Sequence, residues 1–226
     1  MHKPVLFFDF DNTLTEGDVL DRLIEKFSSN DQWRAWESAW ANGRLSARDC
    51  LRYQMEGLRV SRDELLEFLS SVRVDPVFAD ILAWARPRRV EVKIVSDSFL
   101  PLIRHILRNN SIDSVPVMAN DLRFSGDRLI PSFPFNDPAC KRCANAKARH
   151  LAPYRGHNII FAGDGHSDLD AALEASIVFA KNTLAKELGE RSIPFRPFET
   201  LEPVLAYLES IGTSHRVALA RIGRFA

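Results

Sequence analysis

Short apolar runs alternate with helical patterns along most of this chain, and this alternation restricts the fold more than any other feature of the sequence. The runs lie at 5–8, 90–95, 115–119, 158–162 and 177–180, and helical patterns lie at 100–109, 168–175 and 201–208. Parallel strands need long crossover connections, which are usually helices, and strands buried on both faces lose the polar–apolar alternation. The sequence therefore predicts an α/β fold with a Rossmann-like parallel sheet flanked by helices.

One segment breaks this alternation. Residues 15–73 contain about four amphipathic helical patterns and no convincing strand. The segment Ser61-Arg62-Asp63-Glu64 fits a capping box at the start of the last helix. We predict an all-helical cap at 15–73, inserted into a core made of 1–14 and 74–226. Within the core, 122–131 fits a β-hairpin with its turn at Ser125-Gly126-Asp127.

The composition limits what the chain attracts over a distance. Among its 226 residues, Lys and Arg number 30 and so do Asp and Glu, which leaves no net charge to attract nucleic acid or anionic membranes. No stretch approaches the roughly 20 apolar residues of a membrane span, and the run at 5–8 is too short for a signal peptide. Three cysteines, an odd number, argue against a disulfide scaffold. We expect a cytoplasmic protein with reduced thiols.

Two acids follow the first apolar run directly, in the segment Asp9-Phe10-Asp11-Asn12-Thr13. Ligands of open α/β sheets bind beyond the carboxyl ends of the strands. Neighbouring carboxylates at such a position are costly unless a cation or a proton lies between them. An Asx-rich turn after a strand is the structural alternative for this pair alone.

A second apolar run leads into Gly163-Asp164-Gly165-His166-Ser167-Asp168. The glycines let the backbone turn tightly beside a ligand, with Asp164 at a strand end and Asp168 at the start of a helix. A glycine turn with Ser167 or Asp168 as the helix N-cap is the alternative.

Two weaker signals complete the pattern. Ser96 and Asp97 end a third apolar run, where backbone amides and a helix N-terminus can hold phosphate. Lys147 lies upstream of the Asp164 strand, although most lysines are solvated surface charges.

In this order, the four segments resemble the motifs of the haloacid dehalogenase superfamily, in particular its phosphatases with a helical C1-type cap after the first motif. The resemblance spans nearly the whole chain and is nearest to the phosphoserine-phosphatase-like subfamily IB. The segment 95–99, the hairpin end at 126–129 and the segment 140–147 resemble its methionine-salvage branch. That branch includes the phosphatase of 2-hydroxy-3-keto-5-methylthiopentenyl-1-phosphate.

The resemblance implies a Mg²⁺-dependent phosphatase of a small phosphorylated metabolite. Asp9 is expected to be the nucleophile that forms an aspartyl-phosphate, and Asp11 to protonate the leaving group and then activate water. Mg²⁺ prefers oxygen ligands, and Asp9, Asp164 and the backbone carbonyl of Asp11 are expected to hold it.

The same resemblance assigns supporting residues. Ser96, Asp97 and Lys147 are expected to bind the phosphate, and Lys147 also to offset the charge of the nucleophile. Ser167 and Asp168 are expected to support the metal site from a second layer, with Asp168 orienting a metal-bound water or Lys147.

Candidates for substrate binding lie in the helical segment. Arg52 resembles the arginine that binds the substrate carboxylate in phosphoserine phosphatases, and Asp18 stands where those enzymes carry a glutamate. A solvated helix arginine is the alternative for Arg52. Trp33, Trp36 and Trp40 share one helical face, which is usually core but can form an apolar wall toward the substrate.

Cys140 and Cys143 form a CxxC motif. Structural zinc needs four ligands and no second CxxC exists, so zinc completed by His150 and His157 is disfavoured. Related phosphatases carry cysteines before the motif lysine with a different spacing, which leaves Lys141 as a rival to Lys147.

Four alternatives stay open at this level. A receiver-like phosphoacceptor domain also combines acids, a hydroxyl and a lysine around Mg²⁺, but without a helical insertion after its first strand. A degenerate binding protein would not need the intact acids. Two enzymatic alternatives also remain: a phosphomutase or other phosphotransferase, and a phosphoserine phosphatase. For the oligomeric state, we expect a monomer or a homodimer.

Overall fold

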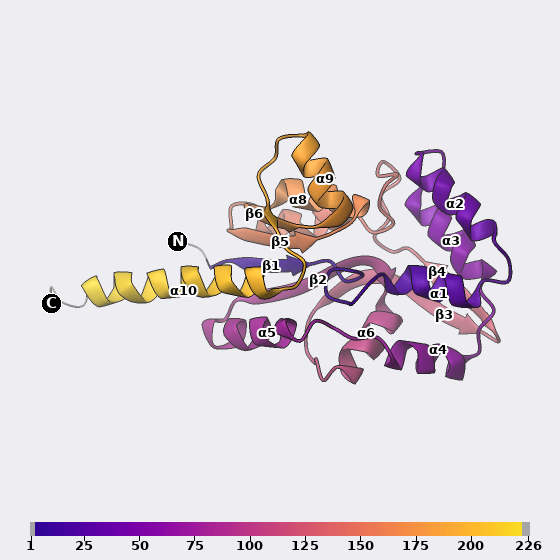
Figure 1. Cartoon of the computed structure of the whole chain (residues 1–226), viewed down its shortest axis with the longest axis horizontal. Helices are drawn as coiled ribbons and strands as arrows, with labels where there is room; N and C mark the ends of the chain where they lie inside the picture. Colours follow the sequence, from indigo (N-terminus) through magenta and orange to yellow (C-terminus); the bar gives the residue numbers. More distant parts are fainter. Residues whose placement is uncertain (1–2, 223–226) are drawn as a thin grey trace.

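The computed structural model describes residues 3–222 of the chain, and the side chains of residues 3–212. A seven-stranded sheet lies at its centre, in the order β4-β3-β2-β1-β5-β6-β7 (Figure 1). Neighbouring strands pair in parallel, except for the antiparallel pair of β3 and β4. The strands are β1 (Val5–Phe8), β2 (Glu91–Phe99), β3 (Val117–Ser125), β4 (Arg128–Ser132), β5 (Ile159–Gly163), β6 (Ile177–Ala180) and β7 (Arg196–Pro197).

Helices cover the sheet on both sides, which confirms the predicted α/β fold (Figure 1). The helices of the core are α5 (Val77–Arg88), α6 (Leu100–Asn109), α7 (Lys147–Leu151), η1 (Ala152–Tyr154), η2 (His166–Asp168), α8 (Leu169–Glu174), α9 (Asn182–Glu190) and α10 (Glu202–Ile222). Strand β2 is longer than predicted and contains Ser96 and Asp97, with an irregularity in its pairing to β3 there. Helix α10 includes much of the tail that follows residue 212, and 223–226 lie outside the described residues.

The central strand β1 shows why its sequence has no polar–apolar alternation. Val5 and Phe7 pack in one apolar cluster, with residues of α8 and α9. Leu6 and Phe8 pack in a second cluster, with residues of α5 and α6. All four side chains are buried, because successive residues of a strand face opposite sides of the sheet.

The segment 15–73 is helical, as predicted, with α1 (Val19–Phe27), α2 (Gln32–Ala41), α3 (Ala47–Gly57) and α4 (Arg62–Ser70). The capping box predicted at Ser61 and Glu64 is present. The chain enters and leaves this segment side by side, since Thr15 and Val74 form an antiparallel bridge. The bridge coincides with the predicted cap boundaries, and the division into two domains stays a prediction.

The helical segment and the sheet share one apolar core. Leu65 and Phe68 of α4 belong to the same buried cluster as Phe8 of β1 and Ile103 of α6. The β3–β4 hairpin also reaches the segment, because Val60 N donates to Asp127 O at 3.4 Å. These contacts hold α1–α4 over the carboxyl ends of the strands, where Figure 1 shows α2 and α3 standing beside the hairpin.

No helix within residues 3–222 has both the length and the apolar character needed to cross a membrane.

Candidate active site

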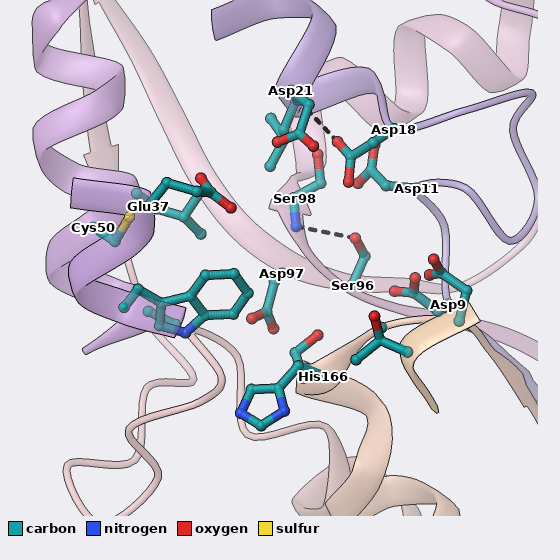
Figure 2. A pocket seen from close by; sticks show the side chains of 18 of the residues that line it. Asp9, Asp11, Asp18, Asp21, Glu37, Cys50, Ser96, Asp97, Ser98 and His166 are labelled. Atoms are coloured by element: carbon teal, nitrogen blue, oxygen red, sulfur yellow. Dashed lines mark hydrogen bonds between the residues drawn. The ribbon is translucent and has the colours of Figure 1, made fainter. Parts of the chain in front are cut away.

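Three neighbouring strands bring the predicted acids and hydroxyl to one edge of the sheet. Asp9 follows β1, Ser96 lies near the end of β2, and Asp164 follows β5. Because β1 pairs in parallel with both β2 and β5, their carboxyl ends meet at this edge. All three residues line one cavity of about 530 Å³ between the sheet and the cap helices (Figure 2).

Lys147 joins this group from α7. Its Nζ lies 2.7 Å from Asp9 Oδ1 and 2.7 Å from Asp168 Oδ1, and its side chain is buried. Burial alone would lower the pKa of Lys147, but the charges of Asp168, Asp9 and Asp97 outweigh it and raise that pKa well above its usual value. The lysine therefore carries a fixed positive charge against Asp9.

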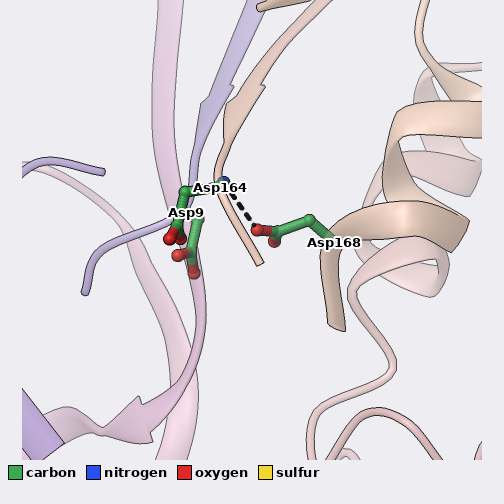
Figure 3. A group of neighbouring side chains, drawn as sticks. All are labelled: Asp9, Asp164 and Asp168. Carbon is green, nitrogen blue, oxygen red and sulfur yellow. Dashed lines mark hydrogen bonds between the residues drawn. The ribbon is translucent and has the colours of Figure 1, made fainter. Parts of the chain in front are cut away.

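Asp9 is crowded by like charges. Burial and the charges of Asp168 and Asp164 raise its pKa well above its usual value, against the opposing effect of Lys147. Asp9, Asp164 and Asp168 can each direct one carboxylate oxygen into a group within 4.8 Å (Figure 3). Such a group is stable when a cation offsets the charge.

The contacts of Asp168 separate its role from that of the other two acids. Its Oδ2 accepts from the backbone N–H groups of Asp164 at 3.0 Å and Gly165 at 2.9 Å, while Oδ1 faces Lys147. Both oxygens are thus engaged within the protein. Asp9 and Asp164 have oxygens that could hold a metal, while the contacts of Asp168 are with Lys147 and the backbone.

The Asp164 carboxylate is suited to bind Mg²⁺. Asp164 Oδ2 accepts from the side chains of Asn12 at 2.7 Å and Asn182 at 3.3 Å, which orient the carboxylate. Burial and the charge of Asp168 raise the pKa of Asp164 to about 6. Oxygen donors held in place and short of positive charge suit Mg²⁺. The sequence offered a signal for Asn12, inside the first motif, but none for Asn182.

Asp11 lies beside Asp9 and also lines the cavity. Its Oδ1 accepts from Val19 N, at the start of α1, at 3.2 Å. Burial and the charge of Asp18 raise the pKa of Asp11 well above its usual value. A raised pKa favours the protonated carboxyl group, which is the form that can donate a proton to a leaving group.

Gly163 has a role that the sequence did not reveal. We expected it to let the backbone turn, but its φ is not positive. A Cβ at this position would lie 2.7 Å from Asp168 Oδ2, so no side chain fits beside that carboxylate. The glycine is needed for space.

Asp97 requires a correction. We predicted it among the phosphate-binding residues, but its carboxylate accepts from Ala144 N at 2.8 Å and Asn145 N at 3.1 Å. It therefore anchors the loop that leads into Lys147. Ser96 Oγ accepts from Ser98 N at 3.0 Å and lines the cavity, where its hydroxyl can still donate to a phosphate oxygen.

The substrate candidates separate in space. Asp18 caps α1, with its Oδ1 accepting from Asp21 N at 2.9 Å, and it lines the cavity. Arg52 does not line the cavity; its guanidinium lies 3.2 Å from Asp49 Oδ1 and is partly exposed. Its position matches the solvated-arginine alternative, because Asp49 in the first turn of α3 attracts it.

The tryptophan face is divided between two environments. Trp33 is buried in the apolar core and Trp36 packs against that core. Trp40 lines the cavity and meets the ring of His166 edge to face, at 6.1 Å between centroids. Because Trp40 lies on α2 and His166 lies in the core, this ring contact joins the cap to the core. His166 Nδ1 is also hydrogen-bonded to Glu187 Oε1.

The cysteine pair also differs from expectation. Cys140 and Cys143 are joined by a disulfide, whereas we expected reduced thiols; two cysteines three residues apart can close a small loop regardless of the total number. No group of zinc ligands forms around them among the described residues. Lys141 lies in the same loop, where its carbonyl accepts from Ala47 N at 2.8 Å. The structure thus brings Lys147, and not Lys141, to Asp9.

Ser167 lines the cavity next to Asp168.

This constellation and the fold define a class, a Rossmann-like α/β core with an acid cluster and a lysine at the carboxyl ends of its strands. The model of the haloacid dehalogenase-like hydrolases matches residues 6–173. The chain therefore belongs to that family, which confirms the family predicted from its motifs.

Individual relatives agree with this assignment. A 2-hydroxy-3-keto-5-methylthiopentenyl-1-phosphate phosphatase of Brevibacillus brevis is 27% identical over 92% of this chain and 96% of its own. A polyol phosphate phosphatase of Saccharomyces cerevisiae is 26% identical over 93% and 95%. A substrate-bound phosphoserine phosphatase has the same fold, with a TM-score of 0.69, 19% identity and coverage of 92% and 98%. The predicted class, a phosphoric monoester hydrolase, is confirmed.

Proposed function

We propose that this protein hydrolyses a small phosphomonoester in two steps, with Asp9 as the nucleophile and Mg²⁺ as the cofactor. The observation that carries the proposal is the contact of Lys147 with both Asp9 and Asp168, next to Asp164 at the end of the neighbouring strand. Lys147 offsets the charge of Asp9, so that an anionic nucleophile can approach an anionic phosphate.

In the first step, an oxygen of Asp9 bonds to phosphorus and the ester oxygen leaves with the proton of Asp11. The raised pKa of Asp11 supports its role as that acid. In the second step, Asp11 takes a proton from water, whose oxygen bonds to phosphorus and displaces the Asp9 carboxylate.

The remaining residues hold the phosphate and the metal. Ser96 and the backbone amides after Asp9 bind phosphate oxygens. Asp9, Asp164 and the carbonyl of Asp11 would hold Mg²⁺, which neutralises charge on the phosphoryl oxygens when bound. Asp168 and Asp97 keep Lys147 in place.

The substrate named from the sequence, a methionine-salvage keto phosphate, stays a proposal. The Brevibacillus relative supports it by name, while the yeast relative is named for polyol phosphates. The structure supports phosphoserine as the substrate less than the sequence does, because Arg52 pairs with Asp49 and does not line the cavity. A cytoplasmic location and a monomeric or homodimeric state are also predictions.

The test is a trapping experiment on Asp11→Asn with ³²P-labelled p-nitrophenyl phosphate and Mg²⁺, because p-nitrophenolate leaves without the proton that Asp11 supplies. Without the acid that activates water, labelled protein should accumulate after acid quenching and lose its label at alkaline pH, as an acyl phosphate does. Asp9→Asn is the matched control and should take up no label. Turnover that EDTA does not reduce, or label in the Asp9→Asn variant, would refute the mechanism. Label that passes to an alcohol and never to water would identify a phosphotransferase.

A further inference from the structure

The cap end of the cavity is lined by acids. Asp21 of α1 and Glu37 of α2 both line it, and Figure 2 shows their carboxylates on different sides of the space. Desolvation and then the charge of Glu37 raise the pKa of Asp21 to about 6. Burial and then the charges of Glu37 and Asp21 raise the pKa of Cys50 to about 12.

No lysine or arginine among the described residues of the cavity lining is free to offset these charges. Lys147 is the only lysine or arginine among the described residues that line the cavity, and it is engaged by Asp9 and Asp168. His166 faces Glu187, a further acid. A negatively charged group on the substrate's far end would meet uncompensated repulsion here.

A buried amide gives independent support. Gln54 lines the cavity with only 2% of its surface exposed, and its Nε2 donates to Glu37 Oε2 at 2.9 Å. This bond orients Glu37 and leaves Gln54 Oε1 without a hydrogen bond among the described residues. Gln54 Oε1 is therefore an acceptor in the cavity lining that a hydrogen-bond donor on a ligand can use.

We propose that the cap end of the cavity selects phosphomonoesters whose far end carries a primary ammonium group. The ammonium would lie between Glu37 and Asp21, donate to Gln54 Oε1, and contact the indole of Trp40, which lines the same cavity and can attract a cation through its ring. A neutral hydroxyl could use the same acceptors but would not offset the repulsion between the carboxylates. The inference rests on the proposed function, because reaction at Asp9 is what anchors the phosphate end. It replaces the methionine-salvage keto phosphate, which has no ammonium group, as the proposed substrate.

The test compares three esters of equal length: 2-aminoethyl phosphate, 2-hydroxyethyl phosphate and carboxymethyl phosphate. They share one chain length, and their terminal groups are positive, neutral and negative respectively. We expect kcat/KM for the amine to exceed that for the alcohol by about tenfold or more, and the carboxylate to be the poorest substrate. p-Nitrophenyl phosphate, which has no such group, reports whether the chemistry works at all.

Variants then locate the selectivity. Glu37→Gln should lower the ratio of kcat/KM for the amine over the alcohol by about tenfold. Glu37→Lys should make the carboxylate a better substrate than the amine. Glu56→Gln is the matched control. Glu56 lies on α3, the helix of Gln54, but it is exposed and does not line the cavity, so the ratio of kcat/KM should not change.

The outcomes separate the two proposals. Failure to hydrolyse any ester, including p-nitrophenyl phosphate, would refute the proposed function. Hydrolysis of p-nitrophenyl phosphate with equal or better use of the alcohol or carboxylate would refute the ammonium site alone. If Glu37→Gln has a different melting temperature from the parent protein, Asp21→Asn is tested in its place. That variant should also lower the ratio of kcat/KM for the amine over the alcohol.

Discussion

At the scale of single residues, the main feature of the site is the balance between its buried acids and Lys147. Lys147 has two buried carboxylates within hydrogen-bond distance, and Asp9 has only one cation against several acids. The ionised form of Asp9 therefore costs stability, which supports the proposed role of this residue as the nucleophile.

Replacing Asp9 tests this directly. In Asp9→Asn we expect kcat to fall below detection, because an amide is not a nucleophile for phosphorus. The melting temperature of the metal-free variant should equal or exceed that of the parent, since one of several crowded anions is removed while Lys147 keeps Asp168. A clear fall in melting temperature would show that Asp9 mainly stabilises the fold.

Gly163 offers a test of a packing requirement. Gly163→Ala would place Cβ 2.7 Å from Asp168 Oδ2 and should displace that carboxylate. We expect a loss of about 1–3 kcal/mol in stability, as for other overpacked sites, and at least a tenfold lower kcat because Lys147 loses its tether. Gly165→Ala is the control for stability, because its Cβ would lie 3.7 Å from the same atom, an ordinary contact. Equal melting temperatures for the two variants would contradict the packing argument.

At the scale of elements, the helix ends and loop anchors decide where the cap helices lie. Helix α4 begins at a complete capping box and packs in the same cluster as α6. Its start is separated from the cavity by the rest of the cap, so stability and catalysis can be tested apart there.

Ser61→Ala removes the N-cap of α4, whose hydroxyl accepts from Glu64 N. We expect a loss of about 0.5–2 kcal/mol in the free energy of unfolding, measured by denaturant titration, because an N–H of the first turn loses its acceptor. The value of kcat should not change, because the residue does not line the cavity. Ser132→Ala, an exposed serine on β4, is the control and should have little effect on either quantity.

At the scale of the whole molecule, the crowded acids link stability to pH and to metal. Burial and neighbouring acids raise the pKa of Asp164 and of Asp18 from about 3.8 to about 6 in the folded protein. A carboxyl group with a raised folded pKa contributes stability below its unfolded pKa, and that contribution is lost as pH rises through the folded value.

Metal-free protein should therefore melt at a lower temperature at pH 7.5 than at pH 5.5. Adding Mg²⁺ should raise the melting temperature more at pH 7.5, because the metal binds the ionised carboxylates and competes with protons at pH 5.5. Differential scanning calorimetry with and without EDTA measures both effects. A melting temperature that Mg²⁺ does not change at pH 7.5 would argue against the metal site.

The sequence alone determined the positions of most strands and of the helical insertion, and it placed Asp9, Asp11 and Asp164 after the ends of strands. These features are local: a buried parallel strand must be continuously apolar, and acids at its carboxyl end have few structural uses. The capping box and the hairpin turn are local for the same reason, and their positions were predicted within a residue or two.

Only the tertiary structure decided between residues whose local sequences look alike. Lys147 and Lys141 both precede the second acidic motif, but the anchoring of 144–145 by Asp97 directs Lys147 to Asp9. The separation of Trp40, which lines the cavity, from the buried Trp33 followed from the packing of α2. Such choices depend on contacts between distant parts of the chain, which residue spacing does not encode.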